Sequence, residues 1–180
     1  MGARSQADLR LRGTGAPLRA GVSWPQVTTA SGVLVFLADA GASPGWGEAF
    51  CTVSCGDAGF VVLSLEEATF ESATTTLEWA ADHASELGAD PARLVVAGQG
   101  GGAALAAALA LRARDCGWPP LTRQVLAGPG LDALPLPAAA MVGVAPATVV
   151  EAHSYAARLR HAGVEVEELR SDEFLSIWRS

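Results

Sequence analysis

Short runs of apolar residues recur along this chain, and each is followed by a segment with the features of a helix. A wholly apolar run is typical of a strand buried on both faces, and strands that alternate with helices form a largely parallel sheet. We therefore predict strands at residues 33–37, 60–63, 93–97, 124–127, 147–150 and 164–169. Helices are predicted at 46–55, 70–87, from the glycines at 98–102 to about 116, at 151–161 and at 172–179. The predicted fold class is α/β, a single domain over residues 1–180 in which residues 1–30 form N-terminal strands or an arm.

Charge and hydropathy exclude two classes of partner. The 180 residues include 19 acidic and 12 basic side chains, for a net charge of −7, which repels phosphate backbones and argues against nucleic acid. No stretch reaches the roughly 18 apolar residues that a membrane-spanning helix needs. The first 20 residues also lack the apolar run of a signal peptide, so we expect a cytoplasmic protein.

The three cysteines do not indicate a disulfide framework or a metal site. Cys51 and Cys55 have helical spacing, and Cys116 stands alone. We expect all three to pack as small apolar residues on helices. No group of histidines, cysteines and carboxylates has the spacing of metal ligands, so we predict neither a metal nor another cofactor.

A glycine-rich turn lies between the strand at 93–97 and the helix that follows it. Its spacing, Gly98-x-Gly100-x-x-Ala103, fits a dinucleotide-binding fingerprint, whose glycines let a pyrophosphate approach the helix. The next strand ends at Gly128 and not at the acidic residue that would bind a ribose. A phosphate loop with a lysine is excluded, because all twelve basic residues are arginine.

Residues 33–131 resemble the hormone-sensitive-lipase group of carboxylesterases, which have the α/β-hydrolase fold. The likeness is carried by Leu-Glu-Trp at 77–79, by Glu-Leu-Gly-Ala-Asp-Pro-Ala-Arg-Leu-Val-Val-Ala-Gly at 86–98 and by the alanine- and leucine-rich segment 105–115. A second stretch, 155–164, is similar to the passage from helix to strand near the end of that family.

The same resemblance implies that the catalytic positions of the family are altered here. The family places a serine at the centre of a G-x-S-x-G turn, where this chain has Gly100. Its H-G-G-G oxyanion loop corresponds to Ala-Asp-Ala-Gly at 38–41, which puts Asp39 among the amides. The acidic loop after the strand at 147–150 is absent, Glu151 being a substitute, and Asp172-Glu173-Phe174 stands where the family has H-G-F. The region 130–146 is shorter than in relatives, so the cap over the cleft is expected to be largely missing.

Polar side chains nevertheless follow several of the predicted strands. Because ligands of such sheets bind beyond the carboxyl ends of the strands, these groups are candidates for acid–base chemistry. The catalytic candidates are Asp39, Glu151, His153 and Asp172. The substrate-binding candidates are Gly41, Trp46, Gln99, Gly100 and Gly101. The alternative for each acid is a solvated loop residue or helix cap, and for His153 an exposed position on a helix.

Three functions remain open on the sequence. The first is a non-covalent cyclase, lyase or isomerase that acts on a small apolar metabolite, by analogy with relatives of the resembled family that have abandoned hydrolysis, such as plant natural-product cyclases and dehydratases. The second is a non-catalytic module that binds a small molecule or a partner, as the esterase-like gibberellin receptor binds its ligand. The third is ester hydrolysis through an unrecognised nucleophile. An apolar surface left by the missing cap would also favour a homodimer.

Overall fold

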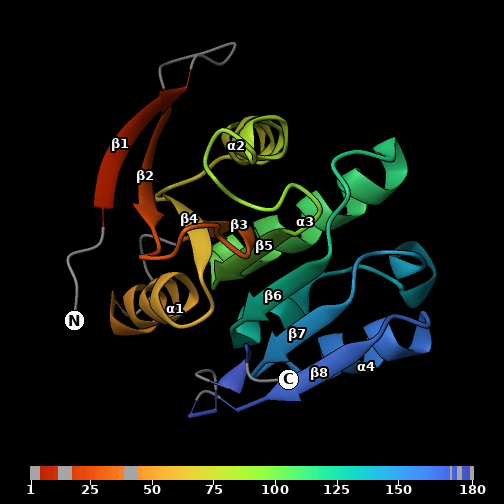
Figure 1. Cartoon of the computed structure of the whole chain (residues 1–180). Helices are drawn as coiled ribbons and strands as arrows, with labels where there is room; N and C mark the ends of the chain where they lie inside the picture. Colours follow the sequence, from red (N-terminus) through yellow and green to blue (C-terminus); the bar gives the residue numbers. More distant parts are fainter. Residues whose placement is uncertain (1–4, 12–17, 39–43, 171, 174–175, 179–180) are drawn as a thin grey trace.

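A computed structural model describes residues 5–11, 18–38, 44–170, 172–173 and 176–178 of the chain (Figure 1). These residues form one eight-stranded sheet in the order β1-β2-β4-β3-β5-β6-β7-β8. Its strands are β1 (Ser5–Leu11), β2 (Leu18–Trp24), β3 (Gly32–Leu37), β4 (Phe60–Leu65), β5 (Leu94–Gln99), β6 (Arg123–Ala127), β7 (Ala147–Val150) and β8 (Val166–Leu169). The predicted α/β fold class is confirmed.

The sheet is antiparallel only at its N-terminal side. β1 pairs with β2, and β2 with β4, in antiparallel register, whereas β4, β3, β5, β6, β7 and β8 are all parallel. Leu34 shows the central register, since it lies opposite Val62 on one side and Val95 on the other. All six parallel strands therefore end at one edge of the sheet, and the segments that follow them meet there.

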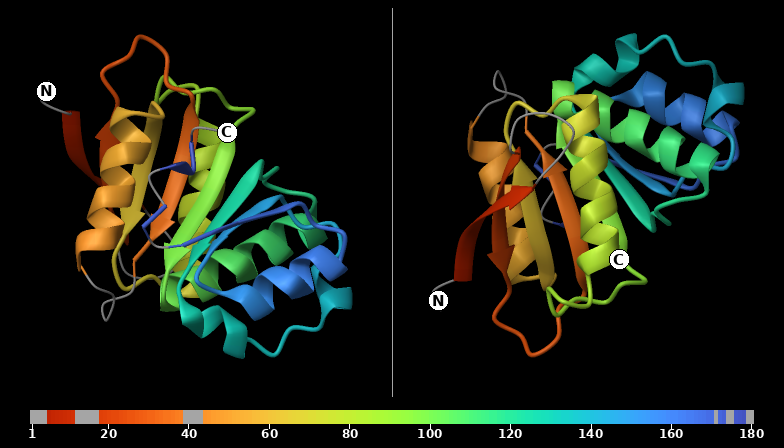
Figure 2. Two further views of the ribbon diagram at one scale, coloured as in Figure 1. Left: turned by 90° about the horizontal axis from the view of Figure 1, so that it is seen from below. Right: turned by 90° about the horizontal axis from the view of Figure 1, so that it is seen from above.

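Helices cover both faces of the sheet. They are α1 (Pro44–Gly56), α2 (Phe70–His83), α3 (Gly101–Cys116) and α4 (His153–His161), with two short 3-10 helices, η1 (Pro129–Ala133) and η2 (Ala138–Met141). Figure 2 shows α2, α3 and α4 on one face, and α1 with the C-terminal segment on the other. This arrangement encloses two apolar cores, as expected for a sheet buried on both sides.

The larger core lies under α2, α3 and α4. It includes Val35 and Leu37 of β3, Leu77 of α2, Ala107 of α3 and Leu159 of α4, all at most 2% exposed. Alanine at many α3 positions lets this helix approach the sheet closely, because a methyl group needs little space.

The smaller core lies under α1 and the C-terminal segment. Phe50 of α1 and Ile177 pack with Leu34 and Val95 of the sheet. The Trp178 indole N–H donates to the hydroxyl oxygen of the buried Ser54 at 3.0 Å. Ile177 and Trp178 are therefore structural parts of this face.

The structure corrects several predicted boundaries. The helix predicted over 70–87 ends at His83, and residues 84–88 form turns. The helix predicted at 151–161 begins only at His153, and β8 begins at Val166. The loop after β6 contains η1 and η2.

The structure also differs from the predicted C-terminal helix and from the predicted burial of Cys116. The helix predicted over 172–179 does not form in its described part, where residues 172–173 and 176–178 are turns or a single 3-10 position. Ile177 and Trp178 nevertheless pack in the smaller core, although both lie in a turn. Cys55 is buried as predicted, whereas Cys116 is exposed at the end of α3.

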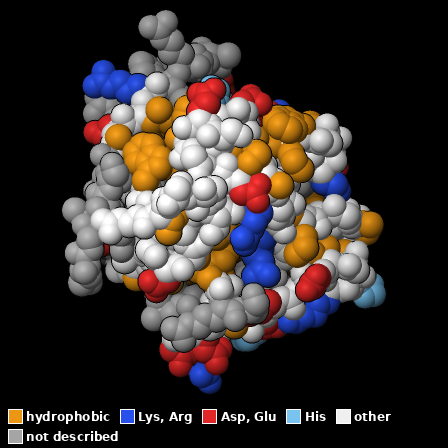
Figure 3. All heavy atoms as spheres, in the orientation of Figure 1, with side chains coloured by type: hydrophobic (Ala, Val, Ile, Leu, Met, Phe, Trp, Pro, Cys, Tyr) orange, Lys and Arg blue, Asp and Glu red, His pale blue; other side chains and the backbone are white. Residues whose placement is uncertain are grey.

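The helices in the described part of the chain are all too short or too polar to cross a bilayer. Side chains of both charges are mixed over the surface seen in Figure 3, with apolar side chains between them.

The C-terminal segment should contribute directly to stability. Ile177→Ala removes a fully buried side chain, and we expect the free energy of unfolding to fall by about 2–4 kcal/mol. The measurement is urea unfolding followed by tryptophan fluorescence. Val142→Ala, at a position 56% exposed, is the matched control and should change it by less than about 0.5 kcal/mol. Equal effects of the two variants would show that the segment does not pack as described.

Candidate active site

The turn between β5 and α3 has the backbone of a sharp elbow with a glycine at its apex. Gly100 has φ 58° and ψ −123°, a combination that side-chain-bearing residues rarely adopt. Its N–H donates to the carbonyl of Ala127 at 2.8 Å, and its carbonyl accepts from Ala103 at 3.1 Å. The predicted turn is present, and its apex has no side chain.

Two flanking glycines make this turn possible by close backbone contact. A Cβ on Gly98 would lie 2.1 Å from the carbonyl oxygen of Gly102, and a Cβ on Gly102 would lie 2.0 Å from the carbonyl oxygen of Leu37. Both distances are far shorter than any tolerated contact. α3 can therefore begin directly against β3 and β5 only because neither residue has a side chain.

Backbone hydrogen bonds continue across the carboxyl edge beyond the strand ends. The N–H of Gly100 donates to Ala127, the N–H of Gly128 to Val150 at 3.0 Å, and the N–H of Glu151 to Leu169 at 3.4 Å. Neighbouring strands lie about 4.8 Å apart, and β6 lies between β5 and β7. The Gly100 turn after β5 is therefore about 10 Å from Glu151 after β7. Glu151 has φ 55°, which turns the chain sharply from β7 into α4.

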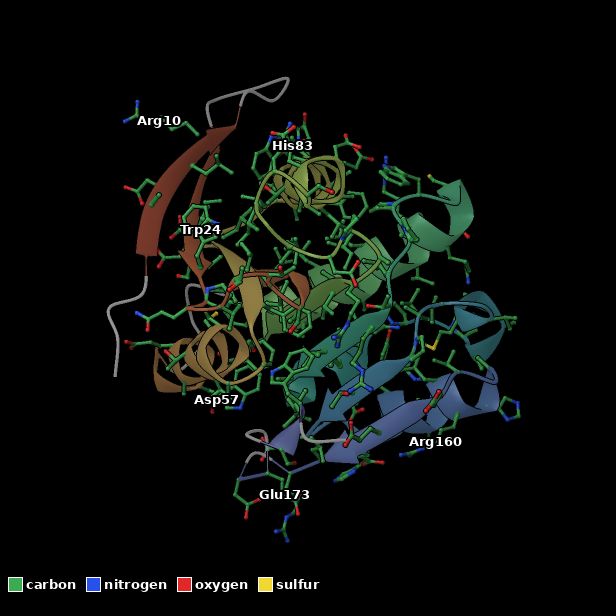
Figure 4. The ribbon with its side chains drawn as sticks, in the orientation of Figure 1. Arg10, Trp24, Asp57, His83, Arg160 and Glu173 are labelled. Atoms are coloured by element: carbon green, nitrogen blue, oxygen red, sulfur yellow. The ribbon has the colours of Figure 1, made fainter. Side chains whose placement is uncertain are left out.

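Three of the four predicted catalytic residues line one hollow at this edge. Glu151, His153 and Asp172 surround an open space of about 480 Å³ together with Leu169 and Arg170. They come from the β7–α4 turn, the first residue of α4 and the C-terminal segment. Figure 4 places the labelled Glu173 beyond the carboxyl ends of β7 and β8, next to this region. The fourth residue, Asp39, lies outside the described residues.

His153 is hydrogen-bonded through Nδ1 to Glu168 of β8. The second carboxylate oxygen of Glu168 accepts from Arg160 at 2.7 Å. The hydrogen bond to Glu168 and the charge of its carboxylate raise the pKa of His153 above its ordinary value. The hydrogen bonds from His153 and Arg160 lower the pKa of Glu168. The histidine ring remains largely in solvent, with 81% of its side chain exposed.

Asp172 is engaged in a second cluster of charges. Arg170 donates to both of its carboxylate oxygens at 3.2 Å and also lies 3.4 Å from a carboxylate oxygen of Glu173. Asp172 and Arg170 are each 71% exposed. The hollow thus contains charged groups of both signs, with Leu169 as its apolar member.

The start of α4 is held by the segment before β7. Asp132 of η1 accepts from the N–H of Tyr155 at 2.7 Å and so caps a helix whose own N-cap, Ala152, makes no side-chain hydrogen bond. Arg158 donates to the carbonyl oxygens of Leu131 and Leu136. These contacts fix the η1 segment to α4, and with it the position of His153.

The predicted substrate-binding residues lie along the same edge but closer to α1. Gln99 is the last residue of β5, and its Oε1 lies 3.4 Å from the point where a Cβ on Gly47 would stand. Trp46 precedes that glycine, is half-buried, and stacks on Phe50 with ring centroids 5.2 Å apart. Gly101 begins α3. Gly41 lies outside the described residues.

Sequence reasoning missed Glu168, Arg160 and Arg170. The alternation in Val166–Leu169 contained the signal for Glu168, because a period of two places it on the same face as Val166, toward α4. Arg160 lies four residues after the buried Ala156, so the helical period places it near the face of α4 that packs on the sheet. Figure 4 shows Arg160 of α4 next to β8, whereas His83 lies on α2, away from the hollow.

The described residues contain no group of three or more histidine, cysteine or carboxylate side chains that could hold a metal ion. The dinucleotide alternative for the glycine turn gains no support from the end of β6, because Gly128, at φ 123°, follows this strand where the fingerprint has an acidic residue.

The close approach at Gly102 gives a direct test of the elbow. Gly102→Ala places a methyl group on the carbonyl of Leu37, so we expect a loss of at least about 2 kcal/mol in unfolding free energy. Gly45→Ala is the matched control, since a Cβ there meets nothing within 4 Å and alanine favours helix. Thermal and urea unfolding of both variants measure the effect, and a Gly102→Ala protein as stable as the control would contradict the geometry.

Part of the sequence is similar to curated esterases. Esterase LipI of Mycobacterium tuberculosis is 44% identical over 59 residues, which are 33% of this chain and 18% of that esterase. Carboxylesterase NlhH of the same organism is 42% identical over 59 residues, again 18% of its length. The matched stretch thus covers less than a fifth of these curated relatives.

Solved structures extend the likeness over most of the chain. A thermostable esterase from Pseudomonas putida superposes with a TM-score of 0.77 at 19% identity, covering 96% of this chain and 76% of that one. An esterase from Pyrobaculum calidifontis gives a TM-score of 0.75 at 23% identity, covering 92% of this chain and 75% of that one.

The family model described as the alpha/beta hydrolase fold matches residues 40–150, from the segment before α1 to the end of β7. The match spans more than half of the chain and includes the Gly100 elbow. The chain therefore belongs to the α/β-hydrolase fold family.

Proposed function

We propose that this chain catalyses a non-hydrolytic acid–base reaction, of the cyclase, lyase or isomerase type, on a small and largely apolar metabolite. One observation carries the proposal: Glu151, His153 and Asp172, which come from different segments, line a single hollow at the carboxyl edge of the sheet. Ligands of parallel sheets bind at this edge, and proton transfer needs groups close to one another.

The glycine at the elbow supports a reaction without a covalent intermediate. A nucleophilic mechanism needs an oxygen or sulfur at the apex, within reach of a base. Gly100 supplies only backbone there, while Gly98 and Gly102 preserve the turn. The backbone shape is therefore retained without a nucleophile at its apex.

In the proposed reaction His153 accepts a proton from a carbon or oxygen of the substrate. The imidazolium of His153 then delivers the same proton to another substrate atom. No group is transferred to the protein, so the balance needs no further reactant. Histidine is the side chain suited to this exchange near neutral pH, because its ordinary pKa of about 6.5 lies near that range.

Two other functions keep specific support. His153 and Asp172 are 81% and 71% exposed. Such an open site does not exclude water from a reaction, which favours a module that binds a ligand without catalysis. The similarity to proteins named as esterases favours ester hydrolysis through another residue. A homodimer remains a proposal, supported by the exposed Trp118 and Val142.

Base-promoted ring opening of nitrobenzisoxazole tests the proposal without knowledge of the substrate. In this reaction a base removes the ring C–H proton, the N–O bond breaks, and a coloured cyanophenolate is released. We expect the wild type to accelerate it and His153→Gln to lower the rate about tenfold. Because the base must be neutral, the rate should rise with pH through a midpoint above 6.5, the ordinary histidine value.

The matched control is His161→Gln, which removes an exposed histidine from the same helix. It should retain the wild-type rate and pH profile. Equal rates for the wild type and His153→Gln at every pH would contradict the acid–base proposal and favour the binding module.

A further inference from the structure

The two nitrogens of the His153 ring have different surroundings. Nδ1 is hydrogen-bonded to Glu168, whose side chain is only 21% exposed on the face of β8 that α4 covers. The rest of the ring is in solvent at the rim of the hollow. A carboxylate at Nδ1 favours the tautomer with its proton on that nitrogen, and this leaves the lone pair on Nε2.

Arg160 holds the carboxylate that binds the ring. It lies about two helical turns from His153 on α4 and donates to Oε2 of Glu168, while His153 is bonded to Oε1. Its chain also approaches the carbonyl of Val166 at 3.5 Å. Both oxygens of Glu168 are therefore engaged, and the carboxylate cannot rotate without losing one partner.

Other charges face His153 from the neighbouring elements. Asp132 of η1 and Glu151 of the β7–α4 turn add to the effect of Glu168 and favour the protonated ring. Arg160 is paired with the second carboxylate oxygen of Glu168. Glu168 contacts the ring at Nδ1, while Glu151 is itself part of the lining of the hollow.

From this geometry we infer that Glu168 and Arg160 are positioning residues, which orient His153 so that Nε2 is the nitrogen that exchanges a proton with a ligand in the hollow. The inference rests on the proposed function for the identity of that exchange, whereas the orientation itself is a property of the free protein. His153 differs from a mobile surface histidine because the carboxylate that binds it is itself held by Arg160.

Nitrogen NMR of the imidazole rings tests the orientation directly. The chain has three histidines, so His153→Gln identifies the relevant signals. In the wild type we expect the neutral ring of His153 to carry its proton on Nδ1. Glu168→Ala should lower the pKa of His153 and allow the proton to move to Nε2, the nitrogen that a free imidazole side chain prefers.

A second variant separates charge from hydrogen bonding. Glu168→Gln keeps an oxygen that accepts from Nδ1–H but has no charge, so the pKa of His153 should fall while the tautomer is retained. Arg160→Gln should weaken the tautomer preference, because the carboxylate loses its second partner. Glu165→Gln, at an exposed glutamate just before β8, is the matched control and should change neither quantity.

The outcomes distinguish the inference from the proposed function. A His153 tautomer and pKa that are the same in the wild type and Glu168→Ala would overturn the positioning. If both change as expected but ring opening of nitrobenzisoxazole does not depend on His153, the positioning stands and the acid–base function fails. If that reaction depends on His153 and its pH midpoint falls in Glu168→Gln, both stand.

Discussion

The contact between the backbones of Gly98, Gly102 and Leu37 is the constraint on which the site depends. It lets α3 begin directly against β3 and β5, so that the chain leaves β5 through the strained conformation of Gly100. Any side chain at either flanking glycine would separate the helix from the sheet. The same contact explains why the elbow persists although its apex carries no reactive group, because the packing of α3 over the larger core requires it.

From this turn the carboxyl edge is ordered by the sheet itself. The hydrogen bonds of Gly100, Gly128 and Glu151 continue the strand pairing by one residue, which sets the spacing between the elbow and the hollow. The η1 segment then fixes the first turn of α4 through Asp132. His153, at that point, is bonded to Glu168 at Nδ1 and is otherwise exposed at the rim of the hollow.

The fold could be predicted from the sequence because its signals are local and strong. Apolar runs such as residues 33–37 are long enough to indicate buried strands, and Gly98–Gly102 marks the turn. Glu151, His153 and Asp172 could be placed at one edge because strand ends were predictable. Their partners could not, since the contacts of His153 with Glu168 and of Asp172 with Arg170 depend on rotamers and on where α4 begins. The described residues of the predicted C-terminal helix are mostly turns, in which Ile177 and Trp178 pack in the smaller core, and such a tertiary contact is not visible in the sequence pattern.

The central claim is that the proposed reaction proceeds without a covalent nucleophile at the Gly100 elbow. Intact-mass spectrometry after incubation with a fluorophosphonate, which phosphonylates activated serines, tests it most directly. With a serine esterase as the positive control, the account predicts that the wild-type mass is unchanged. A gain of one phosphonyl group, prevented by prior denaturation, would mean that an activated nucleophile lies elsewhere in the site and would contradict the claim.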